Sequence, residues 1–208
     1  YTQAYTLSLH DALPIYANGD IAAVMGGLYL RWDRESLHVK AGLSGASSRY
    51  RHSRAVPLSA SAARATYDVQ DMAARAELGY GLHMGAFSVR PFVSVNALRQ
   101  QQEAYRETGG GSAALDVAAI TRQGGDFGIG MEVSRPLLLA RERWAQLQAG
   151  AGVSQPWGDT APVQRSWFTG TTESFSVSTA RHDDVIVDYG LGASFHVSAG
   201  SAFWVGYQ

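Results

Sequence analysis

Apolar and polar residues alternate with a period of two along most of the chain from Asp20 onward. In the clearest stretch, Asp68 to Met84, apolar side chains fill the even positions from Met72 on, while the odd positions hold Arg75, Glu77 and glycines. Successive side chains of a β-strand point to opposite faces. The pattern therefore predicts a strand with one apolar and one polar face.

Five further stretches show the same alternation, and several match or exceed the roughly 9–11 residues that a tilted membrane strand needs. Strands of ordinary β-sandwiches are shorter, about 5–6 residues. No helical periodicity competes with this pattern. The stretches cover residues 37–44, 87–97, 126–134, 145–154 and 185–197.

Turn-forming residues separate these predicted strands. Gly85 and Ala86 stand between Met84 and Phe87, which predicts a tight hairpin. Other glycine- and proline-containing segments predict further turns. They are Gly109 to Ser112, Arg135-Pro136, Pro156 to Pro162, and Ser198 to Ser201.

The composition of the two faces favours a transmembrane barrel over a soluble one. The polar face is rich in Gly, Ser, Gln, Arg and Glu, as expected for a wet lumen, while the apolar face would meet lipid. Such a sheet has to close, because backbone groups cannot stay unpaired in lipid. Aromatic residues near the predicted strand ends fit interfacial girdles, although strands also favour aromatics in general. These are Tyr29, Trp32, Tyr67, Phe87, Tyr105, Phe127, Trp144, Trp157, Trp167, Phe168 and Trp204.

Composition narrows the classes of protein that remain. The chain has 208 residues, enough for one domain or one mid-sized barrel, and no cysteine. With 17 Lys+Arg against 18 Asp+Glu, it carries no charge excess that would indicate a nucleic-acid partner. Mean hydropathy is -0.12 and no segment approaches the roughly 20 apolar residues of a membrane helix. A helical membrane protein is excluded.

The first residues are set apart from this pattern. Tyr5 to Ile15 reads YTLSLHDALPI, which resembles a translated sequencing adapter. A short helix with Leu7, Leu9 and Leu13 on one face is the alternative, and a signal peptide is not indicated, since a basic n-region is missing. Residues 1–15 are therefore predicted to be non-native, and residues 16–208 to form one partial barrel domain.

From Asp71 to Gln208, about two thirds of the chain, the order of motifs resembles the autotransporter β-domain, the translocator of type V secretion. The segment AELGYGLHMGAFSVRPFVSVNALRQQQEAYRETGG, Ala76 to Gly110, resembles the family's strand-turn-strand element, which ends in Tyr105-Arg106-Glu107. Asp126 to Ser134 resembles its glycine-rich strand. Asp188 to Gln208, DYGLGASFHVSAGSAFWVGYQ, resembles its near-terminal hairpin.

The resemblance implies an antiparallel barrel in the outer membrane of a Gram-negative bacterium. The family barrel has twelve strands, of which alternation indicates roughly 8–10 here. The terminal strand is expected to be missing after Val205-Gly206-Tyr207-Gln208, so a fragment is expected. The implied function is to anchor and help export an N-terminal passenger domain outside this chain. Implied partners are outer-membrane lipid and the barrel assembly machinery, with the barrel itself a monomer.

Tests for enzymatic or metal chemistry give no candidate. Gly42-Leu43-Ser44-Gly45 lacks the spacing of a nucleophile elbow, and Gly109 to Gly111 lacks the Lys-Ser/Thr of a phosphate loop. Arg181-His182-Asp183-Asp184 is interpreted as a charged turn. We expect no catalytic residue, cofactor or metal, and no enzyme. The histidines, none with metal-ligand spacing, are His10, His38, His52, His83, His182 and His196.

Charges on the polar face are the remaining candidates for a specific role. They either pair into a ladder that contacts a translocating segment or are simply solvated. Two other functions stay open: a stand-alone outer-membrane porin or barrel enzyme, and a soluble ligand-binding barrel. The charges in question are Arg75, Glu77, Arg90, Glu132 and Asp188.

Overall fold

The computed structural model describes residues 17–56, 61–140, 143–179, 184–198 and 201–207. Within these ranges the chain is built from antiparallel strands and one short 3₁₀ turn, η2 (Gly111–Ala113). The described residues contain no helix that is both long and apolar enough to cross a membrane. The principal strands are β1 (Ala17–Arg34), β2 (Leu37–Arg54), β3 (Ala63–Tyr80), β4 (Leu82–Met84), β5 (Phe87–Gln102), β8 (Ile120–Ala140), β9 (Arg143–Gly158), β12 (Ile186–Ser198) and β13 (Ser201–Tyr207).

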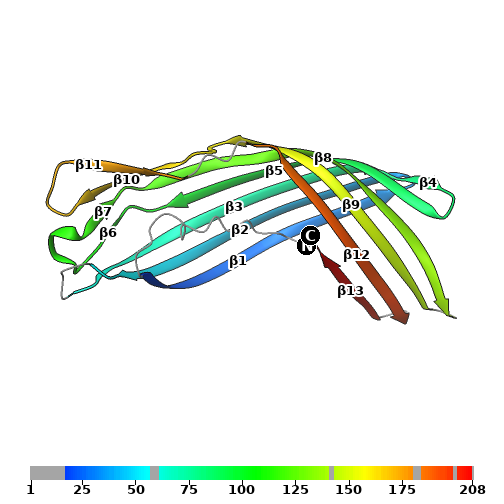
Figure 1. Cartoon of the computed structure of the whole chain (residues 1–208), viewed down its shortest axis with the longest axis horizontal. Helices are drawn as coiled ribbons and strands as arrows, with labels where there is room; N and C mark the ends of the chain where they lie inside the picture. The colour runs from blue at the N-terminus through cyan, green and yellow to red at the C-terminus, as the bar shows by residue number, and fades with distance from the viewer. Residues whose placement is uncertain (1–16, 57–60, 141–142, 180–183, 199–200, 208) are drawn as a thin grey trace.

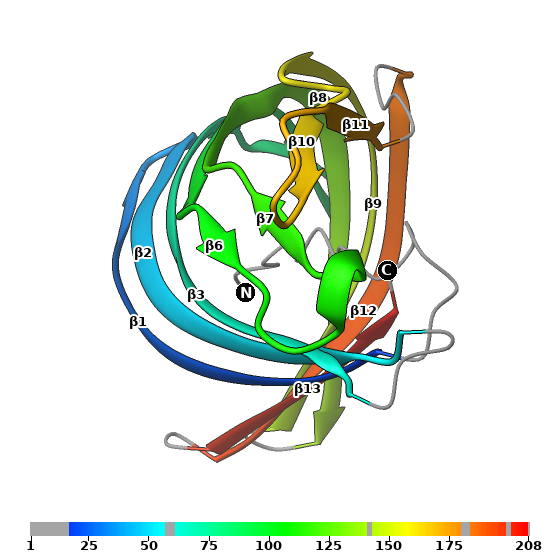
Figure 2. The same ribbon diagram turned by 90° about the vertical axis from the view of Figure 1, so that its left-hand side faces the viewer.

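These principal strands form one sheet, called the wall below, in which each strand pairs with its neighbours in chain order. The order is β1-β2-β3-β5-β8-β9-β12-β13, with β4 added to the end of β5. The strands run side by side and the sheet curls strongly (Figure 1). Seen along its long axis, the wall curves around a central opening (Figure 2). The predicted all-β antiparallel barrel architecture is confirmed.

Connections at the two ends of the wall differ in length. At one end they are tight: Arg34 pairs with Leu37, and Met84 pairs with Phe87 across Gly85, whose φ of 63° suits glycine. This confirms the predicted hairpin. The other end, called the mouth, carries the long connections. They contain β6 (Tyr105–Arg106), η2, β7 (Leu115–Val117), β10 (Val163–Phe168) and β11 (Ser174–Ser178).

The strands of the long connections form a second, smaller sheet, called the loop sheet, in the order β11-β10-β7-β6. Its central contact joins two separate connections, since Phe168 pairs with Leu115 and Ser166 with Val117. The loop sheet lies across part of the opening that the wall surrounds (Figure 2). The two connections thus support one another at the mouth.

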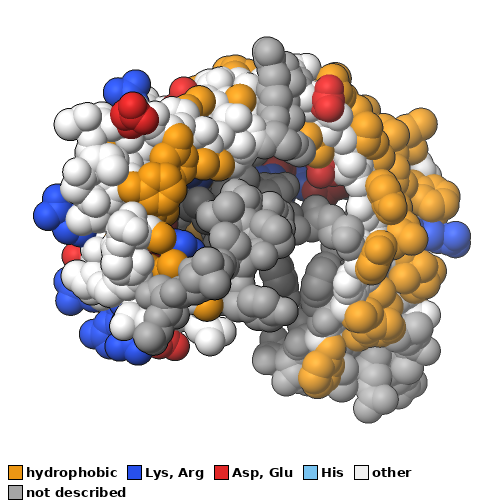
Figure 3. Space-filling view, turned by 60° about the vertical axis from the view of Figure 1, so that its left-hand side comes forward, with side chains coloured by type: hydrophobic (Ala, Val, Ile, Leu, Met, Phe, Trp, Pro, Cys, Tyr) orange, Lys and Arg blue, Asp and Glu red, His pale blue; other side chains and the backbone are white. Residues whose placement is uncertain are grey.

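Apolar side chains lie on the outside of the wall. On β3, Met72, Leu78 and Tyr80 are 65%, 48% and 53% exposed, and no large described side chain is fully buried. Near the mouth, His52 and Arg54 of β2 and Tyr67 of β3 contact the long connection that carries β6. The even positions of β2 and the odd positions of β3, which share their face, therefore lie on the concave side, called the lumen face. In the space-filling view most of the apolar side chains gather along one flank, and a smaller group lies on the other side (Figure 3). Among the described residues the buried apolar side chains are few and small, and most lie near the mouth, as Ala63, Val69 and Val117 do. An exposed apolar outer face of this kind suits a sheet surrounded by lipid.

The apolar outer face has a defined border toward the mouth. Met72 to Tyr80 matches the roughly 9–11 residues that a tilted strand needs to cross the hydrocarbon layer. Toward the mouth the same face becomes polar on both strands. The polar outer residues are Gln70, Asp68, Thr66 and Arg64 on β3, and Ser47, Arg49, Arg51 and Ser53 on β2.

Two predicted turns are wrong in position. Arg135-Pro136 lies inside β8, where the two residues pair with Leu147 and Gln146 of β9. The pairing of β8 with β5 stops at Ser134, so proline sits where the strand has a single neighbour and its missing N–H is tolerated. Pro156 also still pairs with Asp126, and the connection starts only after Gly158.

The predicted aromatic girdles are correct only in part. Trp32, Phe87, Phe127 and Trp157 do lie exposed on the outer face. Tyr67 and Tyr105 instead stack on each other on the lumen side, because the loop sheet folds against β3 there. Trp167 and Phe168 belong to β10 of the loop sheet and are not part of the wall. Tyr29 pairs with Gly42 and therefore lies on the lumen face, not on the outer face.

Candidate functional site

A group of charged side chains crosses the lumen face in the middle of the wall. Strand pairing brings it about: Lys40 stands opposite Glu77, and Arg90 stands opposite Glu132. Arg75 lies two residues before Glu77 in β3 and therefore points to the same face. These five residues are called the lumen cluster.

Glu77 is the centre of the lumen cluster. Its Oε1 lies 2.8 Å from Lys40 Nζ and 3.2 Å from Arg90 Nη1, at ion-pair distance though without the alignment of a hydrogen bond. Arg75 Nη2 donates to Glu77 Oε2 at 3.5 Å. Arg90 also donates a short hydrogen bond to Glu132. One nearly buried carboxylate thus holds three cations.

Burial differs sharply within the lumen cluster. The Glu77 side chain is 5% exposed and Arg90 14%, whereas Arg75 and Glu132 are 54% and 43% exposed. A buried ion pair is strongly destabilised when one partner is removed, while an exposed pair contributes little. Glu77 and Arg90 therefore fix the strands, and the charges of Arg75 and Glu132 stay available toward the lumen.

Four of the five charges singled out in the sequence come together in this cluster, as the ladder hypothesis requires. Asp188 does not join them: it stands exposed opposite Gly152 and has no ion pair within the described part of the chain. Lys40 was missed. Its place in the alternation put it on the polar face, but only the register between β2 and β3 shows that it reaches Glu77.

A second group, called the mouth cluster, fastens the loop sheet to the wall. Glu107, just after β6, is 4% exposed. It accepts a short hydrogen bond from Arg54 Nη2 and a longer one of 3.3 Å from Arg54 Nε, while His52 Nε2 lies 3.1 Å from its Oε1. The backbone N–H of Leu115 donates to Glu107 Oε2 at 2.9 Å. His52, Arg54 and Glu107, with Tyr105, make up this cluster.

Aromatic packing and backbone pairing strengthen the same junction. Tyr105 stacks on Tyr67 with ring centroids 4.3 Å apart, and His52 meets the Tyr105 ring edge-on at 5.5 Å. Burial raises the pKa of the Tyr105 hydroxyl. Arg64 and Thr108 form an isolated antiparallel bridge between β3 and the connection. The loop sheet is therefore held by both side-chain and main-chain contacts.

The Glu107 carboxylate is stabilised in its charged form. Burial alone would raise its pKa, but hydrogen bonds from His52, Arg54 and the Leu115 amide outweigh this and lower the pKa from 4.5 to about 2. A group whose pKa is lower in the folded state adds stability at pH values above its unfolded pKa. That contribution is complete above about pH 4.5 and is lost as the pH falls toward 2.

The other sequence candidates show no constellation of their own. Gly42 to Gly45 lies within β2, and His38 Nδ1 lies 2.6 Å from Asp33 Oδ1. Across the described ranges no three His, Asp or Glu residues come close enough to hold a metal ion. Tyr5 to Ile15, and residues 181–183 of the predicted charged turn, fall outside the described residues.

Comparison with known proteins gives one finding. Residues 16–208 match the family model described as the autotransporter beta-domain. No curated protein matches the chain.

Proposed function

The chain belongs to the autotransporter β-domain family, and from this premise we propose that it anchors a passenger domain and helps to export it to the cell surface. Membership places the chain in the outer membrane of a Gram-negative bacterium, within type V secretion. The passenger itself would precede the barrel in the same polypeptide. Residues 16–208 would then act as one translocator domain.

The observation that carries this proposal is the separation of the two faces of the wall. The outer face is apolar and exposed along the middle of the strands, and the lumen face carries a charged cluster that is partly open. A wall of this kind can sit in lipid and still offer water and charge to a polypeptide inside. A stand-alone porin or barrel enzyme, the alternative function, is not favoured by any residue arrangement among the described residues.

The lengths of the connections support an orientation. Outer-membrane barrels have short periplasmic turns and longer extracellular loops. The tight turns after Arg34 and Met84 would accordingly face the periplasm, and the mouth with its loop sheet would face the exterior. A passenger would leave through the mouth. We further propose that the barrel assembly machinery inserts this barrel into the outer membrane and that the barrel is a monomer.

Charge at Glu132 is expected to influence export, because this carboxylate is open to the lumen and pairs with Arg90. In the full parent protein, Glu132→Lys places a cation beside Arg90 and removes a contact for a passing segment. We expect the rate of passenger display to fall about fivefold, which corresponds to roughly 1 kcal/mol at the barrier. Display is measured by protease shaving of intact cells over time.

Asp188→Lys serves as the matched control for this experiment. It makes the same charge reversal on the same face, at a residue without an ion pair within the described chain. Display by this variant should stay near the wild-type rate. Unchanged display by Glu132→Lys, with normal amounts of inserted barrel, would remove the role of the lumen cluster in export.

A further inference from the structure

Arg122 is a buried cation that has no carboxylate partner in the described part of the chain. The residue is only 9% exposed. Its Nε atom is buried and has no hydrogen-bond partner among the described residues. Burying an unpaired charge is costly, and buried charges in proteins are therefore normally paired. The folded wall thus holds a guanidinium group whose counter-ion is not supplied by the described residues.

Strand register places Arg122 on the lumen face, close to the mouth. Arg122 pairs with Gln100 of β5, and Gln100 pairs with Asp71, which lies at an odd, lumen-facing position of β3. The outer face of β8 is polar at Gln123, and its apolar stretch begins only at Phe127. Arg122 therefore lies beyond the apolar stretch of its strand, on the way from the lumen to the mouth.

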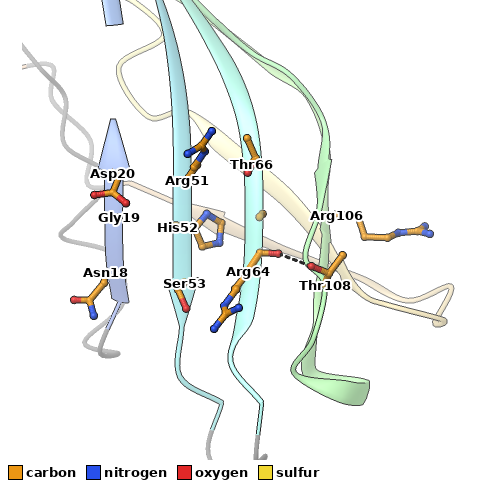
Figure 4. A pocket seen from close by; sticks show the side chains of 11 residues that line it. Asn18, Gly19, Asp20, Arg51, His52, Ser53, Arg64, Thr66, Arg106 and Thr108 are labelled. Atoms are coloured by element: carbon orange, nitrogen blue, oxygen red, sulfur yellow. Dashed lines mark hydrogen bonds between the residues drawn. The ribbon is translucent and has the colours of Figure 1, made fainter. Parts of the chain in front are cut away.

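Other arginines without an ion pair in the described ranges differ from Arg122 because they are exposed. Arg51 and Arg64 line a cavity at the edge of the mouth that is open to the outside (Figure 4). Arg99 is exposed on the outer face of β5. Water can solvate these charges, so they need no partner. Among the arginines and lysines whose side chains the structure describes, Arg122 alone is both buried and unpaired.

The carboxylates that share the lumen face with Arg122 are engaged with amides. Asp71 Oδ1 accepts a hydrogen bond of 2.9 Å from Gln100 Nε2, and Asp126 Oδ1 accepts one of 2.8 Å from Asn96 Nδ2. Burial lowers the pKa of Arg122, and no neighbouring charge offsets this effect. The other described carboxylates toward the mouth are Glu107 and Asp116, paired with Arg54 and Arg106, Asp68, paired with Arg49, Asp159, bound to the Gln123 amide, and the exposed Asp20, Glu103, Glu173 and Asp184.

We propose that Arg122 binds an Asp or Glu carboxylate of the exported polypeptide while that polypeptide lies in the lumen. The inference rests on the proposed export function, because export brings a polypeptide past Arg122. A guanidinium group presents a planar fork of N–H donors that matches the two oxygens of a carboxylate. Because the site is largely shielded from water, the attraction is screened less than it is at an exposed arginine.

Arg122 is separate from the lumen cluster. Gly128 stands in the same row of the sheet as Glu77 and Ser94, and Arg122 lies six residues farther along β8. At about 3.4 Å per residue the separation is about 20 Å. The lumen cluster offers open charges of both signs, whereas Arg122 offers a positive charge alone. An acidic residue of the polypeptide therefore rests preferentially beside Arg122.

Disulfide trapping in the full parent protein tests this preference. A small folded domain fused to the passenger arrests export, and the stretch held in the lumen is replaced by a neutral Gly-Ser-Gln sequence. This stretch carries one cysteine next to a single Asp, Asn or Lys, and the pair is moved along it one residue at a time. The second cysteine replaces Leu98, which lies on the lumen face opposite Gly124, two residues from Arg122. The disulfide yield is measured on non-reducing gels.

In the wild-type lumen, the best-placed Asp stretch is expected to give about tenfold more disulfide than the Asn stretch, as one charge-assisted pair would provide. R122Q should make the two yields equal, and R122E should transfer the preference to the Lys stretch. R99Q is the matched control, because Arg99 is also unpaired in the described chain but faces outward. It should keep the wild-type preference.

The outcomes separate this inference from the proposed function. A parent protein that cannot display a passenger carrying the neutral stretch, without the arresting domain, would refute export itself. Normal display with equal Asp and Asn yields would overturn only the role of Arg122, as would an unchanged preference in R122Q whose folding is confirmed by resistance to cold detergent. Equal yields together with protection of Arg122 from phenylglyoxal by inorganic phosphate would assign a free-anion site and also overturn the proposal.

Discussion

Replacement of Glu77 by alanine is expected to destabilise the folded wall by about 3–5 kcal/mol, the usual cost of stranding a buried ionic partner. The Glu77 side chain is 5% exposed and holds Lys40 and Arg90, whose own side chains are only 26% and 14% exposed. Without the carboxylate, Lys40 loses its ion-pair partner and Arg90 keeps only the more exposed Glu132. The free energy of unfolding can be measured by urea titration of the micelle-refolded parent barrel.

Glu132→Gln is the companion variant. Its side chain is 43% exposed, so solvent screens the pair with Arg90 and its loss should cost no more than about 1 kcal/mol. Glu77→Ala should therefore destabilise the wall clearly more than Glu132→Gln does. Equal destabilisation would mean that Glu77 is not the centre of the lumen cluster.

Replacement of Glu107 by alanine is expected to release the loop sheet while the wall stays folded. The carboxylate is 4% exposed and satisfies Arg54, His52 and the Leu115 amide at once. Its loss leaves the Arg54 guanidinium, 13% exposed, without its carboxylate partner and should cost about 3–5 kcal/mol locally. Limited proteolysis of intact barrels should then cut between Glu103 and Ala118, where the wild type resists.

Low pH should also release the loop sheet in the wild-type protein. Because the pKa of Glu107 is lowered to about 2, protection of the loop sheet should be constant above about pH 4.5 and decline as the pH falls toward 2. Hydrogen exchange of the β6 and β7 amides reports this. Glu103→Ala is the control, since Glu103 is exposed in the same connection. Protection that is identical in Glu107→Ala and wild type would contradict the role of the mouth cluster.

The wall could be predicted from sequence because its pattern is local. Alternation with period two can be recognised within a single segment. The segment Met72 to Tyr80 shows it without any knowledge of the neighbouring strands. The hairpin at Gly85 was equally local, since a two-residue turn forces the pairing around it. Which face meets lipid followed from the polarity of the two faces.

The candidate site could be predicted only in part because it depends on register. Arg75, Glu77, Arg90 and Glu132 were placed on one face by alternation, but their meeting needs the alignment of β3, β5 and β8. The mouth cluster was missed because His52 and Glu107 are 55 residues apart and only the folded connection brings them together. Pro136 predicted a turn because proline usually interrupts a strand, but β8 continues through it beside a single partner.

Site-directed spin labelling tests the central claim, that the outer face of the wall meets lipid. The chain contains no cysteine, so single cysteines can be introduced at Ala73 and Ala74, adjacent residues of equal size on opposite faces of β3. In bilayers, a nitroxide at 74 should collide more with oxygen than with a water-soluble nickel chelate, and one at 73 should show the reverse. A nitroxide at Gln70, on the same face as 74 but beyond the border, should also favour nickel. Preference for nickel at 74, or the same behaviour at 73 and 74, would contradict the account.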